Sequence, residues 1–160
     1  MASPFEGGKS PDFHISKKWH KVYQNLCRRV GTFNALFKKY TNLYTLCAAI
    51  GYHLNEKIEL DKEKETPFTL EQVDENTEWP VLIAIAWVDA GQDMNIFNNS
   101  KEIIRICDQY AEAGMKKIMS MHPFDKIFTK DYELLNPENY EVELNTAFIL
   151  QELKKDFSLL

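Results

Sequence analysis

Residues 41–51, Thr-Asn-Leu-Tyr-Thr-Leu-Cys-Ala-Ala-Ile-Gly, are uncharged and rich in small and apolar side chains. Thr41 belongs to the residue types that cap the start of a helix, and Gly51 to the type that most often ends one in the left-handed conformation. Strongly basic sequence precedes the segment and strongly acidic sequence follows it. We therefore expect a buried helix at the centre of the molecule, with the two charged flanks outside.

Charge is divided unevenly along this chain of 160 residues, whose net charge is −5. Residues 1–39 carry a balance of +6, residues 40–55 carry no charge, residues 56–78 carry −6 and residues 79–160 carry −5. A polyanion would therefore meet only the N-terminal part of the protein.

Length and composition predict one domain with a sizeable core, because 44% of the residues are hydrophobic. No apolar run is long enough to cross a membrane, and the N-terminus has no secretory h-region. The three cysteines are far apart in the sequence. These features predict a cytoplasmic protein with reduced thiols.

The first helix is expected from a cap at Ser16 to about Val30, because apolar residues recur there on one helical face. The rest of its surface is basic, which predicts a sequence-independent contact with the phosphates of DNA or another polyanion. The cations are Lys17, Lys18, Lys21, Arg28 and Arg29. The competing interpretation is that they pair with the protein's own acidic loop or with an acidic partner.

Helical patterns continue through most of the chain. A flexible N-terminal arm is expected at 1–14, followed by a single helical domain at 15–160 in which residues 53–78 form a long acidic surface loop. Other helices are predicted at 32–40, 41–51, 78–88, 100–114 with one or two further turns to 121, and 140–157. The predicted fold class is all-α, a single-domain bundle of about six helices.

Catalytic and metal-binding patterns are largely missing. The histidines are too far apart for a zinc-binding helix, and the cysteines lie at apolar helical positions that favour core packing. The carboxylates of 59–64 are the residue types of a metal-dependent nuclease, but a solvated loop does not hold them rigidly enough. We therefore expect no catalytic residue, no metal site and no cofactor.

Three aromatic side chains are candidates for contact with a partner protein. Trp79 and Trp87 lie on one stripe of the helix expected at 78–88, and Phe97 follows in the next loop. Exposed aromatic residues mark protein interfaces. The alternative interpretation is that they pack in the core.

Three segments together resemble a known family: residues 37–53, which end a capped helix with Ala-Ala-Ile-Gly and continue to Tyr-His, residues 81–87 with Ala-Ile-Ala, and residues 103–118 with Tyr-Ala-x-x-Gly. Over about residues 33–120 the chain resembles the small accessory proteins found with bacterial DNA-sulfur-modification (Dnd) systems. The resemblance implies a fold-determining role for residues 44–51 and 110–114, and it carries over no catalytic residue.

The function implied by this resemblance is a non-catalytic accessory subunit of a prokaryotic anti-phage defence complex. It would dock a larger defence-system protein, an ATPase, helicase or nuclease, with DNA as a second partner through the basic helix. Two alternatives remain open: a small metal-dependent nuclease and a stand-alone protein-binding inhibitor.

Overall fold

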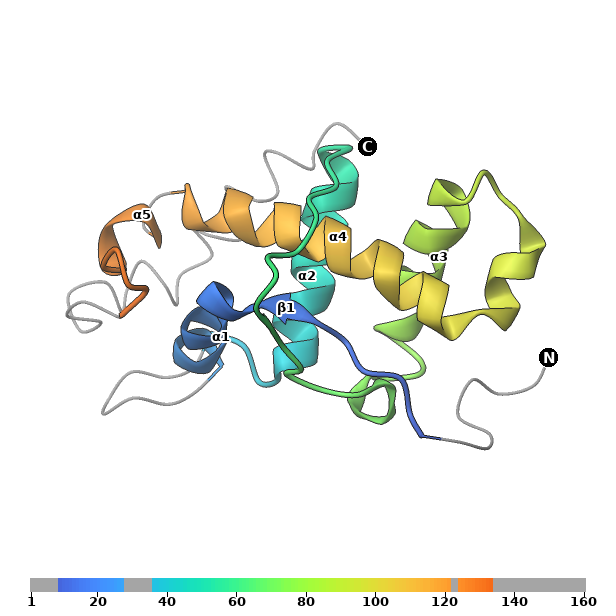
Figure 1. Cartoon of the computed structure of the whole chain (residues 1–160), viewed down its shortest axis with the longest axis horizontal. Helices are drawn as coiled ribbons and strands as arrows, with labels where there is room; N and C mark the ends of the chain where they lie inside the picture. The colour runs from blue at the N-terminus through green and yellow to red at the C-terminus, as the bar shows by residue number, and fades with distance from the viewer. Residues whose placement is uncertain (1–8, 28–35, 122–123, 134–160) are drawn as a thin grey trace.

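The computed structural model describes residues 9–27, 36–121 and 124–133 (Figure 1). Within these ranges the α-helices are α1 (His20–Leu26), α2 (Tyr40–His53), α3 (Trp79–Asp89), α4 (Ser100–Met119) and α5 (Phe124–Ile127). Three short 3-10 helices are η1 (Lys17–Trp19), η2 (Leu70–Gln72) and η3 (Met94–Asn98). Two antiparallel strands, β1 (Ile15–Ser16) and β2 (Lys64–Glu65), pair Ile15 with Glu65 and Ser16 with Lys64.

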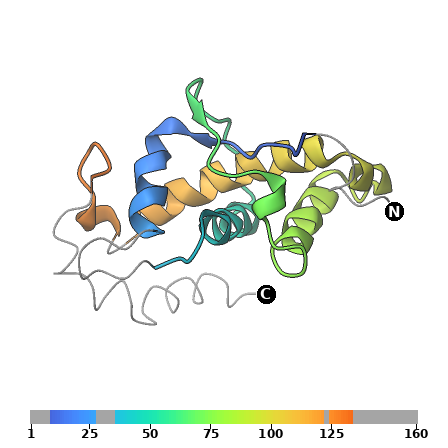
Figure 2. The same cartoon turned by 90° about the horizontal axis from the view of Figure 1, so that it is seen from below.

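The prediction of a mostly helical protein is confirmed, but the expected all-α bundle of about six helices differs in two ways. The described part of the chain has five α-helices and a small two-stranded sheet. Its two longest helices also cross instead of lying side by side, since Figure 2 shows α2 nearly end-on and α4 along its length. The helix predicted at 140–157 lies outside the described residues.

The crossing of α2 and α4 is the centre of the fold, and it depends on two glycines. A Cβ on Gly51 would lie 2.0 Å from the carbonyl oxygen of Tyr110, and one on Gly114 would lie 1.8 Å from that of Cys47. Both glycines therefore allow backbone to touch backbone. The prediction that Gly51 and Gly114 end their helices is wrong, because both lie inside continuous helices.

Helix boundaries also depend on caps that the sequence pattern misplaced. Thr41 lies inside α2, and the side-chain oxygen of Asn42 accepts a hydrogen bond from the backbone N–H of Lys39. Residues 36–39 are not helical, so the helix expected at 32–40 does not form there. At α4 the cap is Asn99, whose side chain accepts from the N–H of Glu102.

Residues 11–14, the last part of the expected arm at 1–14, are packed against the rest of the protein, whereas residues 1–8 lie outside the described residues. Phe13 is fully buried, its N–H donates to the carbonyl of Phe68, and the N–H of Leu70 donates to the carbonyl of Pro11. The ring of Phe13 packs against those of Tyr44 and Phe68. The later part of the acidic loop thus contributes to the core because its apolar residues meet this segment.

Candidate functional site

A groove of about 750 Å³ lies between η1 and α1, the acidic loop, and residues 130–133 after α5. It contains five lysines and four acidic residues as well as Tyr132. Its lining residues are Lys17, Lys18, Lys21, Asp61, Lys62, Glu63, Lys130, Asp131, Tyr132 and Glu133. We call it the lysine groove. The three lysines predicted to bind polyanions therefore share one concave surface.

Each of these three lysines is paired with an acid of the same chain. Lys17 Nζ lies 3.1 Å from Glu63, Lys21 Nζ lies 2.5 Å from Glu133, and Lys18 bridges two carboxylates. Hydrogen bonds to Glu63 and Glu133 raise the pKa values of Lys17 and Lys21. Exposed pairs of this kind contribute little to stability and can exchange for other anions.

Two further lysines in the groove have no acidic partner within the described ranges. Lys62 and Lys130 are exposed and make no ion pair there. Arg28 and Arg29, the other predicted cations, lie outside the described residues. The competing interpretation of the basic helix, pairing with the acidic loop, accounts for Lys17 and Lys18, while Lys62 and Lys130 keep an anion-binding role chemically possible.

Two acidic residues of α4 are buried one turn apart beneath the N-terminal segment. Asp108 accepts hydrogen bonds from the hydroxyl of Tyr44 at 2.6 Å, from the backbone N–H of His14 at 3.2 Å and from His14 Nδ1 at 3.3 Å. Glu112 accepts from the indole N–H of Trp19 at 2.8 Å and pairs with Lys18 at 3.3 Å. These carboxylates fix the N-terminal segment on α4.

The electrostatics of this pair follow from burial and hydrogen bonding. Burial raises the pKa of the Asp108 carboxyl, although the bonds from His14 and Tyr44 oppose that shift. The hydrogen bond to Asp108 raises the pKa of His14. Sequence reasoning missed both acids because Asp108 and Glu112 have the spacing of an ordinary solvated helix face. These two acids can be recognised as buried hydrogen-bond acceptors only when the positions of the N-terminal donors in the fold are known.

A second surface is formed by α3, which lies at the opposite end of the molecule from α1 in both views (Figures 1 and 2). Its residues 79–88 contain no charge. Leu82, Ile85 and Ala86 are buried against the core, while Val81 and Val88 remain 39% and 41% exposed. Met94 on the adjoining η3 is 64% exposed. This part of the protein is therefore an exposed apolar face, which we call the α3 face.

The aromatic residues predicted to bind a partner lie beside this face at different depths. Trp79 is only 6% exposed and packs in the core. Trp87 and Phe97 are half-buried and stack on each other with ring centroids 6.2 Å apart. The most exposed apolar side chains, Val81, Val88 and Met94, were not predicted. The sequence feature that could have indicated them is the run without charge at 79–88, in a helix that packs against the core on one side.

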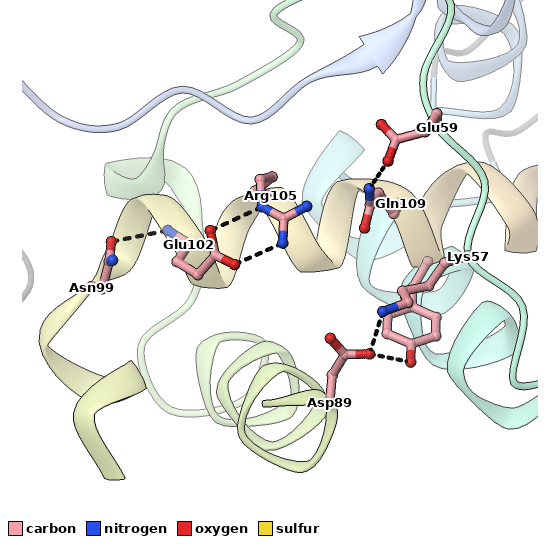
Figure 3. A network of polar contacts seen from close by, with 8 residues as sticks. Lys57, Glu59, Asp89, Asn99, Glu102, Arg105 and Gln109 are labelled. Carbon is pink, nitrogen blue, oxygen red and sulfur yellow. Dashed lines mark hydrogen bonds and ion pairs between the residues drawn. The ribbon is translucent and has the colours of Figure 1, made fainter. Parts of the chain in front are cut away.

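Polar contacts hold the end of α3 against the neighbouring elements (Figure 3). Asp89 accepts from the Tyr110 hydroxyl at 2.7 Å and pairs with Lys57 at 2.8 Å. Burial would raise the pKa of Asp89, but the bonds from Lys57 and Tyr110 lower it overall. Arg105 makes two hydrogen bonds to Glu102 on α4. Through Asp89, the end of α3 is therefore tied to α4 and to the loop after α2.

The residues considered for metal or nucleophilic chemistry are used in other contacts. Asp61 pairs with Lys18, Glu63 with Lys17, and Glu59 accepts from Gln109. In the described ranges no three His, Cys, Asp or Glu side chains come together as metal ligands. The three cysteines are free, and burial raises the pKa of the Cys27 thiol to about 12, the opposite of an activated nucleophile.

Comparison with known proteins gives one family. The model of the family described as DNA sulphur modification system-associated protein 4 matches residues 13–136. The chain belongs to this family. The match confirms the resemblance found in the sequence and reaches beyond it at both ends, to the Phe13 segment and past Glu133.

Comparison with curated proteins and with solved structures gave no match. None of the helices in the described ranges combines the length and hydropathy needed for a membrane crossing. The association with DNA sulphur modification therefore rests on the family match, and it agrees with an accessory role.

Proposed function

We propose that this chain is a non-catalytic accessory subunit of a DNA sulphur modification system, and that it serves anti-phage defence by docking a larger ATPase, helicase or nuclease of that system. The observation that carries the proposal is the α3 face, an exposed apolar surface on a member of a system-associated family. Large exposed apolar surfaces on small proteins mark interaction sites.

The absence of a catalytic role is supported by how the acids are used. Asp108 and Glu112 are buried and accept hydrogen bonds from donors of the same chain. A general acid or base must instead reach a substrate. Both carboxylates serve to join the N-terminal segment to α4.

Co-expression tests the proposal. The tagged chain is produced together with the other proteins of its DNA sulphur modification system, and stable partners are identified after affinity purification and size-exclusion chromatography. We expect a stoichiometric complex with one larger protein. A chain that elutes alone at micromolar concentration with every one of these proteins would contradict the accessory role.

A second candidate function is contact with DNA in the lysine groove. It is favoured by Lys62 and Lys130, which make no ion pair in the described ranges and lie beside Lys17 and Lys21, two lysines held by exposed ion pairs. Such a contact would be independent of base sequence and sensitive to salt. In the complex, it would place the partner protein on DNA.

A further inference from the structure

Residues 79–88 of α3 carry no charge on any side of the helix, although one side faces solvent. Helices that are hydrophobic all round are normally buried. In the described part of the chain α3 packs against α2, α4 and η3, whereas its Val81, Ala84 and Val88 are exposed. Their i, i+3, i+7 spacing forms one stripe roughly 10 Å long at 1.5 Å per residue. The stripe has the pattern of a site for a second helix.

Charge around this stripe is of one sign. Between Lys64 and Lys101 the sequence contains seven acidic residues and no lysine or arginine. Glu71, Asp74 and Glu75 are exposed before α3, and Asp93 is exposed after it. The apolar stripe is therefore flanked by negative charge at both ends.

This charge pattern disfavours a second copy of the chain as the occupant. If two α3 stripes faced each other, acidic ends would meet acidic ends in both the parallel and the antiparallel arrangement. Juxtaposed like charges weaken association and suppress wrong partners. The complementary surface is apolar at its centre and basic at its ends.

We infer that the α3 face binds an amphipathic helix of the larger partner protein, with apolar residues on one stripe and Lys or Arg on both flanks. The inference rests on the proposed function and names the surface and the chemistry of the partner. A groove recognises such a helix through apolar side chains at positions i, i+3 or i+4, and i+7. Met94 offers an adaptable contact beside the stripe.

The test compares variants in the co-expression complex. Val81→Ser with Val88→Ser removes apolar surface from the stripe, and Glu75→Lys reverses a flanking charge that makes no hydrogen bond or ion pair within the described ranges. The matched control is Glu56→Lys, an exposed acid after α2 that belongs neither to the α3 face nor to the lysine groove. Affinity for the purified partner is measured by calorimetry, and folding is checked by thermal melting.

We expect the double serine variant to lose about tenfold or more in affinity, as removal of central interface residues does. Glu75→Lys should lose about threefold at low salt and less at high salt, because rim charges act through screened attraction. Glu56→Lys should bind as the unmodified chain does.

Four results would overturn the inference, and they are distinguishable. If the partner binds the folded double serine variant with unchanged affinity, the surface is wrong while the proposed function stands. If the partner binds but Glu75→Lys binds more tightly, the partner's flanks are not basic. If the chain instead forms a dimer in sedimentation that the serine variant abolishes, the occupant is a second copy. Failure of every system protein to bind the unmodified chain overturns both the function and the inference.

Discussion

Gly51 of α2 and Gly114 of α4 lie at one helix crossing, each against the backbone of the other helix. A Cβ on Gly114 would meet the carbonyl oxygen of Cys47 at 1.8 Å, and one on Gly51 would meet that of Tyr110 at 2.0 Å. In both helices the contacted carbonyl is four residues before the glycine. The close spacing of α2 and α4 at this crossing therefore depends on the absence of a Cβ at both positions.

Gly114→Ala should destabilise the protein by about 3 kcal/mol, despite the better helix propensity of alanine, because the backbone it strikes cannot rotate away. Gly51→Ala should behave in the same way. The matched control is Gly91→Ala, where a Cβ would meet nothing within 4 Å and the only cost is a positive φ of 67°, about 1 kcal/mol. Urea unfolding measures all three. Equal effects at the three sites would show that close packing is not the cause.

The hydroxyl of Tyr44 supports the buried Asp108. Tyr44→Phe should cost about 2 kcal/mol in the free energy of unfolding, because a buried carboxylate loses a hydrogen bond of 2.6 Å. Tyr23→Phe is the control, since its hydroxyl is equally buried but bonds no carboxylate in the described part of the chain. The difference between the two variants isolates the charged hydrogen bond. A Tyr23 variant that loses as much would remove this explanation.

His14 should make stability depend on pH. Its pKa in the folded protein is raised from about 6.5, first by the hydrogen bond to Asp108. The folded state therefore binds the proton more tightly than the unfolded chain does. This contribution is complete below the unfolded pKa and is lost as pH rises through the folded pKa, so stability should fall as the pH rises above about 6.5.

The magnitude of this effect is small, less than about 1 kcal/mol, because the His14 side chain is 41% exposed and screened by solvent. Urea unfolding at several pH values measures it. His14→Gln keeps the backbone bond to Asp108 and should flatten the dependence. If the slope in that range survives the substitution, another group is responsible.

The sequence pattern predicted helix boundaries well where they depended on a single helix alone. The α3 helix starts next to its expected position, with Pro80 in its first turn, and Gly91 follows its end with a positive φ. Gly51 and Gly114 were recognised as special, but a glycine that ends a helix and one that lies at a crossing look alike in sequence. The distinction needs the facing helix.

The candidate surfaces depended on contacts between distant residues. Lys17 is 46 positions from Glu63, and Lys21 is 112 positions from Glu133. Helical spacing gathers Lys17 and Lys21 on one face but does not reveal which acids meet them. The exposure of Val81 and Val88 was also hidden, because a helix without charge is normally covered on all sides. Both the pairing of the lysines and the exposure of the two valines depend on the tertiary arrangement.

Incubation with nucleic acid tests the metal-dependent nuclease. The purified chain with Mg²⁺ or Mn²⁺ and double- or single-stranded DNA should release no fragments, because Asp61 and Glu63 are paired with lysines and Glu59 with Gln109. Gel electrophoresis over several hours measures cleavage. The control is the double variant Asp61→Asn with Glu63→Gln. Metal-dependent cleavage that this variant abolishes would establish the enzyme and contradict the accessory role.

Removing the acidic partners of the groove lysines tests whether these lysines contact DNA. Glu63→Gln with Glu133→Gln removes the partners of Lys17 and Lys21 without changing their positions in the sequence. If the lysine groove contacts phosphates, affinity for duplex DNA should rise several-fold at low salt, and the slope of log affinity against log salt should steepen by about 0.9 for each added phosphate contact. Lys17→Glu with Lys21→Glu should have the opposite effect.

Lys116→Glu controls for net charge, and fluorescence anisotropy across a salt series measures every variant. If both groove variants bind as the unmodified chain does, the lysine groove is a self-neutralised surface and the basic helix has no part in DNA contact.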